Sequence, residues 1–220
     1  RITSVTRGLA AIERRAEEGA ASGLVVGEGA HEAGAPERTM VQVAGHRILE
    51  KGAEFDLHAT VSDGATTAWE SVNTFYVRGR FGAPTADSIP EALKVSPCDT
   101  AQWRMPAGGG WHYGGLSGDY NPLHLWSGYA REHGFAQAFF HPQRVLGQCL
   151  ARLPARGWPL PLQLDAWLKG PVFYGAPVTM RSAAAGGEAV FALHVDEDER
   201  PAIVGRLRKL EPGSRLTQQI

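Results

Sequence analysis

One apolar helix followed by four strand-forming segments is the pattern that most restricts how this chain can fold. The helix is predicted to begin at His141-Pro142, because proline is favoured at the first helical position, where its missing N–H is not needed. Gly157 and Pro159 are expected to end it. Its apolar face consists of Val145, Leu146, Cys149, Leu150 and Leu153. The strand candidates that follow are residues 164–173, 178–184, 189–195 and 202–210. A helix followed by consecutive strands predicts an α+β fold with an antiparallel sheet. No Gly-x-Gly-x-x-Gly follows a strand, so a dinucleotide-binding fold has no support.

The first half of the chain also contains a strong strand signal. Phe55, Leu57, Ala59 and Val61 alternate with polar residues, which is typical of a half-buried strand. A turn at residues 62–64 then predicts a partner strand over residues 69–80. Residues 4–19 are predicted to form an amphipathic helix, residues 20–38 a loop, and the proline- and glycine-rich residues 82–110 a linker.

Composition excludes several classes of function. The 220 residues carry 22 lysines and arginines against 23 acidic residues, without the basic excess typical of nucleic-acid binders. No apolar run approaches the ~18 residues that a membrane span needs. The two cysteines, Cys98 and Cys149, fit neither a disulfide framework nor a zinc motif, so we expect a reduced, cytoplasmic location.

One stretch contains residues that packing alone would seldom require. It reads Ser117-Gly118-Asp119, then Asn121-Pro122, then His124. Gly118 permits a tight turn, Pro122 fixes the chain direction, and Asn121 can hydrogen-bond the local backbone. A rigid loop of this kind would hold Asp119 and His124 in fixed positions. A carboxylate and an imidazole that reach one water form a general acid–base pair. The alternative is structural, with Asp119 capping a helix and His124 a polar residue at a helix start.

The whole segment resembles the hydratase-2 motif of the MaoC-like dehydratases, or (R)-specific enoyl-CoA hydratases. The residues that match this motif are Tyr113, Ser117, Gly118, Asp119, Asn121, Pro122, Leu123, His124 and Ala130. Gly134-Phe135 and the aromatic residues before His141 continue the likeness, and residues 169–173 look like the strand that builds the family's acyl-thioester tunnel. The resemblance implies a hot-dog fold, in which an antiparallel sheet wraps a central helix. It further implies a double hot dog, with a degenerate N-terminal half over residues 1–105 and a catalytic domain over residues 106–220.

The chemistry implied by the resemblance is reversible hydration of a trans-2-enoyl thioester, a step of fatty acid metabolism. Asp119 would activate the water for attack on the β-carbon. His124 would orient that water and serve the proton delivered to the α-carbon. Ser117, Gly118 and Asn121 would support the loop. No metal and no other cofactor is expected. The implied substrate is an acyl-CoA or acyl-carrier-protein thioester, and the implied assembly is a homodimer or heterodimer that pairs through the sheets.

One position departs from the family pattern. Family members have glycine after the histidine that corresponds to His141, and its N–H is a donor to the thioester oxygen, whereas this chain has Pro142, which has no N–H. Loss of one such donor typically costs ~10²–10³ in rate. The side chain or backbone of Gln143, the side chain of His141 or an altered substrate pose could replace it. The departure also leaves open a second reading, a non-catalytic subunit that binds acyl thioesters.

Other residues allow two readings each. His112, His124, His133 and His141 cluster in the sequence, but their spacing fits no zinc motif, so a metal site is not expected. Tyr120 and Trp126 could line an acyl pocket or pack in the core. Four cations could contact coenzyme A phosphates or form a solvated strand face, namely Lys169, Arg206, Arg208 and Lys209.

Overall fold

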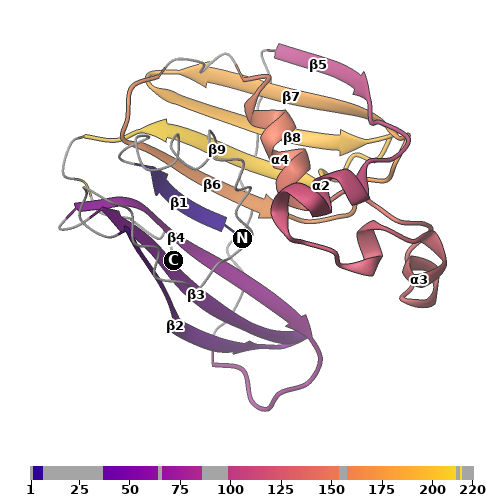
Figure 1. The fold of residues 1–220 in the computed structure, drawn as a ribbon, viewed down its shortest axis with the longest axis horizontal. Coiled ribbons are helices and arrows are strands. Elements are labelled where there is room, and N and C mark those ends of the chain that lie inside the picture. The colour runs from indigo at the N-terminus through magenta and orange to yellow at the C-terminus, as the bar shows by residue number, and fades with distance from the viewer. Residues whose placement is uncertain are drawn as a thin grey trace.

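The computed structural model describes residues 2–6, 37–63, 66–85, 99–153, 158–211 and 214. Within them, nine strands form one antiparallel sheet in the order β2-β3-β4-β1-β6-β9-β8-β7-β5 (Figure 1). The strands are β1 (Ile2–Thr6), β2 (Glu37–Leu49), β3 (Gly52–Asp63), β4 (Thr66–Arg78), β5 (Asp99–Arg104), β6 (Leu162–Leu168), β7 (Pro177–Ala185), β8 (Glu188–Val195) and β9 (Ile203–Lys209). The helices are α2 (Gly110–Ser117), the 3₁₀ turn η1 (Pro122–His124), α3 (Ser127–Glu132) and α4 (Pro142–Leu150). The α+β prediction is confirmed.

Helix α4 lies across the second half of the sheet and supplies its core (Figure 1). It begins at Pro142 as predicted. Val145 and Cys149 are fully buried, and Leu146 and Leu153 are nearly so. They form one cluster with the inward side chains of the strands, which include Ala166, Val178, Met180, Phe191, Leu193 and Ile203. The helix ends at Leu150, earlier than predicted, and Leu153 precedes Pro154, which disfavours a helical backbone there. The predicted stop at Gly157 lies outside the described residues.

The predicted helix over residues 4–19 is wrong where the structure describes it. Residues 4–6 belong to β1, which pairs with β4 on one side and β6 on the other. The segment Ile2–Thr6 contains four β-branched residues, which favour a strand. The rest of that predicted helix, and the predicted loop up to residue 36, lie outside the described residues; residues 37 and 38 begin β2.

Two further boundaries need correction. The predicted linker over residues 82–110 contains β5, which pairs with β7 from Asp99 opposite Ser182 to Arg104 opposite Pro177. The strand predicted over residues 164–173 ends at Leu168, and residues 169–173 form a loop because Pro171 cannot donate to a ladder. The division at residues 105 and 106 remains a prediction, and β5 shows that the residues before it contribute a strand beside β7.

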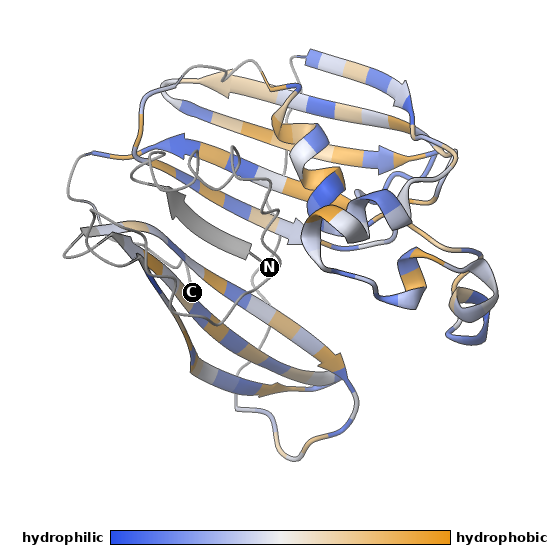
Figure 2. Cartoon of the chain, viewed as in Figure 1, coloured by the Kyte–Doolittle hydropathy of each residue, from blue (hydrophilic) through white to orange (hydrophobic). Residues whose placement is uncertain are grey.

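The strand register places the apolar side chains of both halves on one side of the sheet. Phe55 lies opposite Phe75, and their rings stack with centroids 5.2 Å apart. Asn73, two residues before Phe75 in β4, lies opposite Ile2 of β1. Ile2 in turn lies opposite Ala166 of β6, which belongs to the core under α4. Because side chains alternate between the faces, Phe55 and Phe75 share a side with α4. This side of the first half is only partly covered, since Phe75 is 48% exposed. The alternation of apolar and polar residues along its strands is visible in Figure 2.

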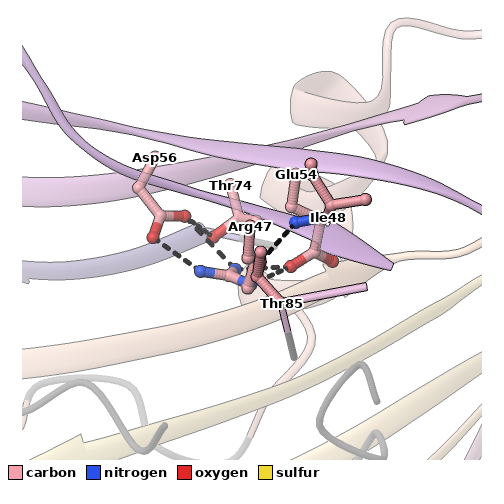
Figure 3. A network of polar contacts seen from close by, with 6 residues as sticks. All are labelled: Arg47, Ile48, Glu54, Asp56, Thr74 and Thr85. Atoms are coloured by element: carbon pink, nitrogen blue, oxygen red, sulfur yellow. Dashed lines mark hydrogen bonds and ion pairs between the residues drawn. The ribbon is translucent and has the colours of Figure 1, made fainter. Parts of the chain in front are cut away.

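The opposite side of β2–β4 carries a buried polar cluster. Arg47 hydrogen-bonds to Glu54 and donates from Nη1 to Asp56 Oδ2 at 2.9 Å, while Thr74 Oγ1 donates to Asp56 Oδ1 at 2.6 Å (Figure 3). Glu54 and Asp56 are only 4% and 6% exposed. The alternation in the sequence predicts this side to face water. The guanidinium allows the two carboxylates to be buried instead, because buried charges must be paired.

No helix among the described residues is long and apolar enough to cross a membrane.

Two glycine substitutions test the packing. In Gly205→Ala, the new methyl group would overlap the ring of Phe191, which is fully buried opposite it in β8. We expect a loss of about 1–3 kcal/mol in the free energy of unfolding, because the ring has no space to move into. In Gly147→Ala, the methyl group would meet nothing within 4 Å on the exposed side of α4, so we expect a gain of about 0.5–1 kcal/mol. Urea unfolding measures both, and equal effects of the two variants would contradict this account.

Candidate active site

The loop after α2 is held by its own side chains. Gly118 adopts a left-handed conformation with φ of 74°, which glycine accepts without a Cβ clash, and its N–H donates to the carbonyl of Gly114. Ser117 Oγ donates to the carbonyl of Tyr113 at 2.8 Å and accepts from the N–H of Asp119 at 3.2 Å. The predicted tight turn is therefore present, and it delivers Asp119 to a fixed place.

Asp119 and Asn121 then form successive side-chain turns. Asp119 Oδ1 accepts from the N–H of Asn121 at 3.1 Å, and Asn121 Oδ1 accepts from the N–H of Leu123 at 3.1 Å. Asn121 is the N-cap of η1, which begins at Pro122 and ends at His124. The predicted backbone role of Asn121 is confirmed. Asp119 does not cap η1, whose N-cap is Asn121; its carboxylate closes the preceding turn through Oδ1.

His124 is 6% exposed and is oriented by a backbone carbonyl. Its Nδ1 lies 3.0 Å from the carbonyl oxygen of Phe139, which can only accept, so we assign the proton to Nδ1. The lone pair of the neutral ring is then on Nε2. Burial lowers the pKa of His124 below its ordinary value, and the neighbouring His141 acts in the same direction. His124 is therefore a neutral hydrogen-bond acceptor near pH 7.

His141 is fully buried at the N-cap of α4, beside His124. Its Nε2 lies 3.0 Å from the backbone carbonyl oxygen of Asp119, which can only accept, so Nε2 carries the proton of this hydrogen bond. Its Nδ1 has no hydrogen-bond partner among the described residues. The rings of His124 and Tyr113 lie 4.2 Å and 4.7 Å away between centroids. A buried acceptor without a partner is rare in proteins and marks a place for a water or a ligand.

Asp119, His124 and His141 converge on one point. One ligand atom from each lies within 4.8 Å of the others, and this is the one such cluster in the part of the chain that the structure describes. The arrangement can hold a water molecule between a carboxylate and a neutral imidazole. It also offers the donor types that a transition-metal ion accepts, with each imidazole held by a carbonyl on its other nitrogen.

Other predicted residues have different outcomes. Gln143 is exposed on the first turn of α4. His112 and His133 do not join the cluster; His133 Nδ1 donates to the carbonyl of Tyr129 at 2.9 Å. Tyr120 and Trp126 are 53% and 61% exposed, which excludes core packing.

The four cations considered for coenzyme A phosphates have different surroundings. Arg208 is partly buried, and its Nε has no hydrogen-bond partner in the described part of the chain. Arg206 is buried and its Nη2 lies 2.9 Å from a carboxylate oxygen of Asp165, so it is not a free cation. Lys209 Nζ lies 5.2 Å from the ring centroid of Trp158. Lys169 lines a hollow of about 610 Å³ with Phe173 and the turn after β8. Phe173 in turn bridges to Phe139, the residue that orients His124.

Sequence reasoning misses two residues beside the site. Tyr174 Oη donates to the carbonyl of His124 at 2.8 Å, and no motif marks it. Arg144 follows His141 by three positions, so it lies one helical turn further along α4. Its guanidinium lies 6.0 Å from the centroid of the Tyr113 ring, which contacts His141.

Comparison with known proteins gives the fold. No family model and no curated protein matches the chain. Among solved structures, a MaoC-like dehydratase from Phytophthora capsici is 17% identical with a TM-score of 0.68, over 97% of this chain and 69% of that one. The chain has the hot-dog fold of the MaoC-like dehydratases.

Other MaoC-fold structures resemble it to a similar degree. HtdX from Mycobacterium tuberculosis is 22% identical with a TM-score of 0.67, over 95% of this chain and 75% of that one. The peroxisomal multifunctional enzyme type 2 of Drosophila melanogaster is 19% identical with a TM-score of 0.61, over 96% of this chain and 36% of that one. The predicted hot-dog architecture is confirmed.

The pKa of His124 gives a prediction for stability. Because the folded protein holds this pKa below the ordinary value of 6.5, the unfolded chain binds the proton more readily. The stability that depends on neutral His124 is present above pH 6.5 and is lost as the pH falls below it. We expect His124→Asn, which keeps a donor for the Phe139 carbonyl, to lose less unfolding free energy than the wild type between pH 7.5 and pH 5.5. Parallel urea titrations at both values measure this, and equal losses would contradict it.

Proposed function

We propose that this chain catalyses the reversible hydration of trans-2-enoyl thioesters. The observation that carries the proposal is the convergence of the Asp119 carboxylate with the imidazole of His124, each fixed by backbone hydrogen bonds. The hot-dog fold shared with MaoC-like dehydratases supports the same reaction class.

The geometry suits addition of one water across the double bond. His124 Nε2, with its lone pair, accepts a hydrogen bond from the water, and Asp119 accepts the proton as the water oxygen attacks the β-carbon. The π bond breaks, a C–O bond forms at the β-carbon, and the dyad returns a proton to the α-carbon. Both residues finish in their starting protonation states. The addition of water is redox-neutral overall, so the reaction needs no electron acceptor. Dehydration of an (R)-3-hydroxyacyl thioester is the same sequence reversed.

The proposed substrate is a thioester of coenzyme A or of a carrier protein. The loop over residues 169–173, which resembles the tunnel segment of the family, lines a hollow of about 610 Å³. Phe173 of that loop contacts Phe139 beside His124, with ring centroids 6.4 Å apart. We further propose that the protein pairs as a homodimer or heterodimer through its sheet, whose order ends in β2 and β5.

Pro142 favours a second candidate, a subunit that binds acyl thioesters without turning them over. The helix that provides a donor in related proteins begins here with a residue that has no N–H. A binding subunit, however, has no need for a carboxylate and an imidazole fixed beside one another.

Loss of enoyl-thioester ultraviolet absorbance tests the proposal directly. The purified protein is added to a short and a long trans-2-enoyl-CoA, beside Asp119→Asn and the control Asp99→Asn, whose carboxylate is exposed on β5. We expect turnover by the wild type, a loss of ~10²–10⁴-fold in Asp119→Asn because the general base is removed, and no change in the control. Binding of both thioesters without turnover would instead support the non-catalytic subunit.

Metal dependence gives a second test. If a water occupies the point between the three residues, EDTA should leave the rate unchanged. Added Zn²⁺ should inhibit, because it would occupy the position of the water with two imidazoles and a carboxylate as ligands. Loss of activity in EDTA that returns with a metal ion would contradict a metal-free mechanism.

A further inference from the structure

The start of α4 lacks the backbone N–H that the resemblance to the hydratases implies at this position. Negative charge that develops on a thioester oxygen must be met by groups already in place. Pro142, the first residue of the helix, has no N–H, and its N-cap His141 makes no side-chain capping bond. This inference rests on the proposed hydratase function and names the group that meets that charge.

Neither of the two side chains that the sequence suggests as replacements suits the task. The Nε2 of His141 already bonds to the carbonyl of Asp119, so it is not available to a thioester oxygen. The Gln143 side chain belongs to an exposed residue on the first turn, and no hydrogen bond holds it in place in the described part of the chain. A long side chain that nothing orients is a poor preorganised donor.

Arg144 is oriented and lies close to the site. Its Nη1 donates to the carbonyl of Gly109 at 2.8 Å, and its guanidinium carbon lies 5.0 Å from the ring centroid of Phe140 and 6.0 Å from that of Tyr113. The Tyr113 ring contacts His141. These contacts fix the guanidinium near the first turn of α4, and the Tyr113 ring lies near both the guanidinium and His141.

The guanidinium of Arg144 forms no ion pair within the described part of the chain. Among the described residues, no carboxylate lies within ion-pair distance of it, and one of its five N–H groups is used by Gly109. Tyr113 lies between two charges: burial and the charge of Asp119 raise the pKa of its hydroxyl, and the charge of Arg144 opposes that rise. The field of the guanidinium therefore reaches the group that adjoins the proposed base.

We propose that the guanidinium of Arg144 binds the thioester carbonyl oxygen and stabilises its negative charge during hydration, in place of the N–H that Pro142 lacks. A guanidinium donates hydrogen bonds and carries a full charge, so it can substitute for a backbone donor. The aromatic rings and the Gly109 carbonyl hold it in place before the substrate arrives.

The test compares Arg144→Gln and Arg144→Lys with a matched control, Arg152→Gln. Arg152 makes the same kinds of contact beyond the other end of α4: its Nη1 donates to the carbonyl of Gln148 at 2.9 Å, and its guanidinium carbon lies 4.1 Å from the centroid of the Trp103 ring. It is eight residues from Arg144, about 12 Å along a helix. The measurements are kcat and KM with a trans-2-enoyl-CoA, the Kd of the saturated acyl-CoA of equal length, and the unfolding temperature.

If Arg144 meets the charge, Arg144→Gln lowers kcat by ~10²–10³-fold while KM and the Kd of the saturated thioester change little, because the interaction strengthens only in the transition state. Arg144→Lys, which keeps the charge, retains much more of the rate, and Arg152→Gln is close to wild type. Three outcomes overturn the proposal: an unchanged kcat in Arg144→Gln, no rescue by lysine, or equal losses in Arg144→Gln and Arg152→Gln. Wild-type turnover that Asp119→Asn abolishes establishes the hydratase independently of Arg144; without wild-type turnover both proposals fail.

Discussion

Two backbone carbonyls determine what the candidate site can do. The carbonyl of Phe139 accepts a hydrogen bond from Nδ1 of His124, and the carbonyl of Asp119 accepts one from Nε2 of His141. Each bond fixes both the orientation of a buried ring and the nitrogen that keeps a lone pair. The second bond also ties the N-cap of α4 to the loop that carries the proposed base. Without these bonds the same three residue types could face one another in several tautomeric patterns.

The sheet explains why the loop and the helix meet. Helix α4 is held against β6–β9 by a core in which Val145, Cys149, Phe191 and Leu193 are fully buried. This fixes the position of its N-terminus. Tyr174, in the turn before β7, reaches back to the carbonyl of His124. The end of η1 is therefore attached to the sheet as well as to the helix.

The two sides of the first half of the sheet differ in polarity and burial. On one side Arg47 pairs with the buried carboxylates of Glu54 and Asp56. On the side shared with α4, Val43, Phe75 and Val77 are exposed. β1 joins this half to the second through backbone pairing with both β4 and β6. Whether this half is a reduced hot dog remains a prediction.

The sequence by itself determined the elements whose signals are local. Pro142 starts α4, the alternation around Phe55 forms β3, and Gly118 and Asn121 make the turns that their backbone preferences require. It also placed Asp119 and His124 on one rigid loop, because the four residues between them include Asn121 and Pro122, whose backbone preferences favour a fixed turn. Only the tertiary structure decided that residues 4–6 and 99–104 are strands, since their hydrogen-bond partners are remote in the chain. It likewise brought His141, Tyr174 and Arg144 to the site. Those contacts join segments 20 to 50 residues apart, and such contacts are set by how α4 packs on the sheet, which no local pattern encodes.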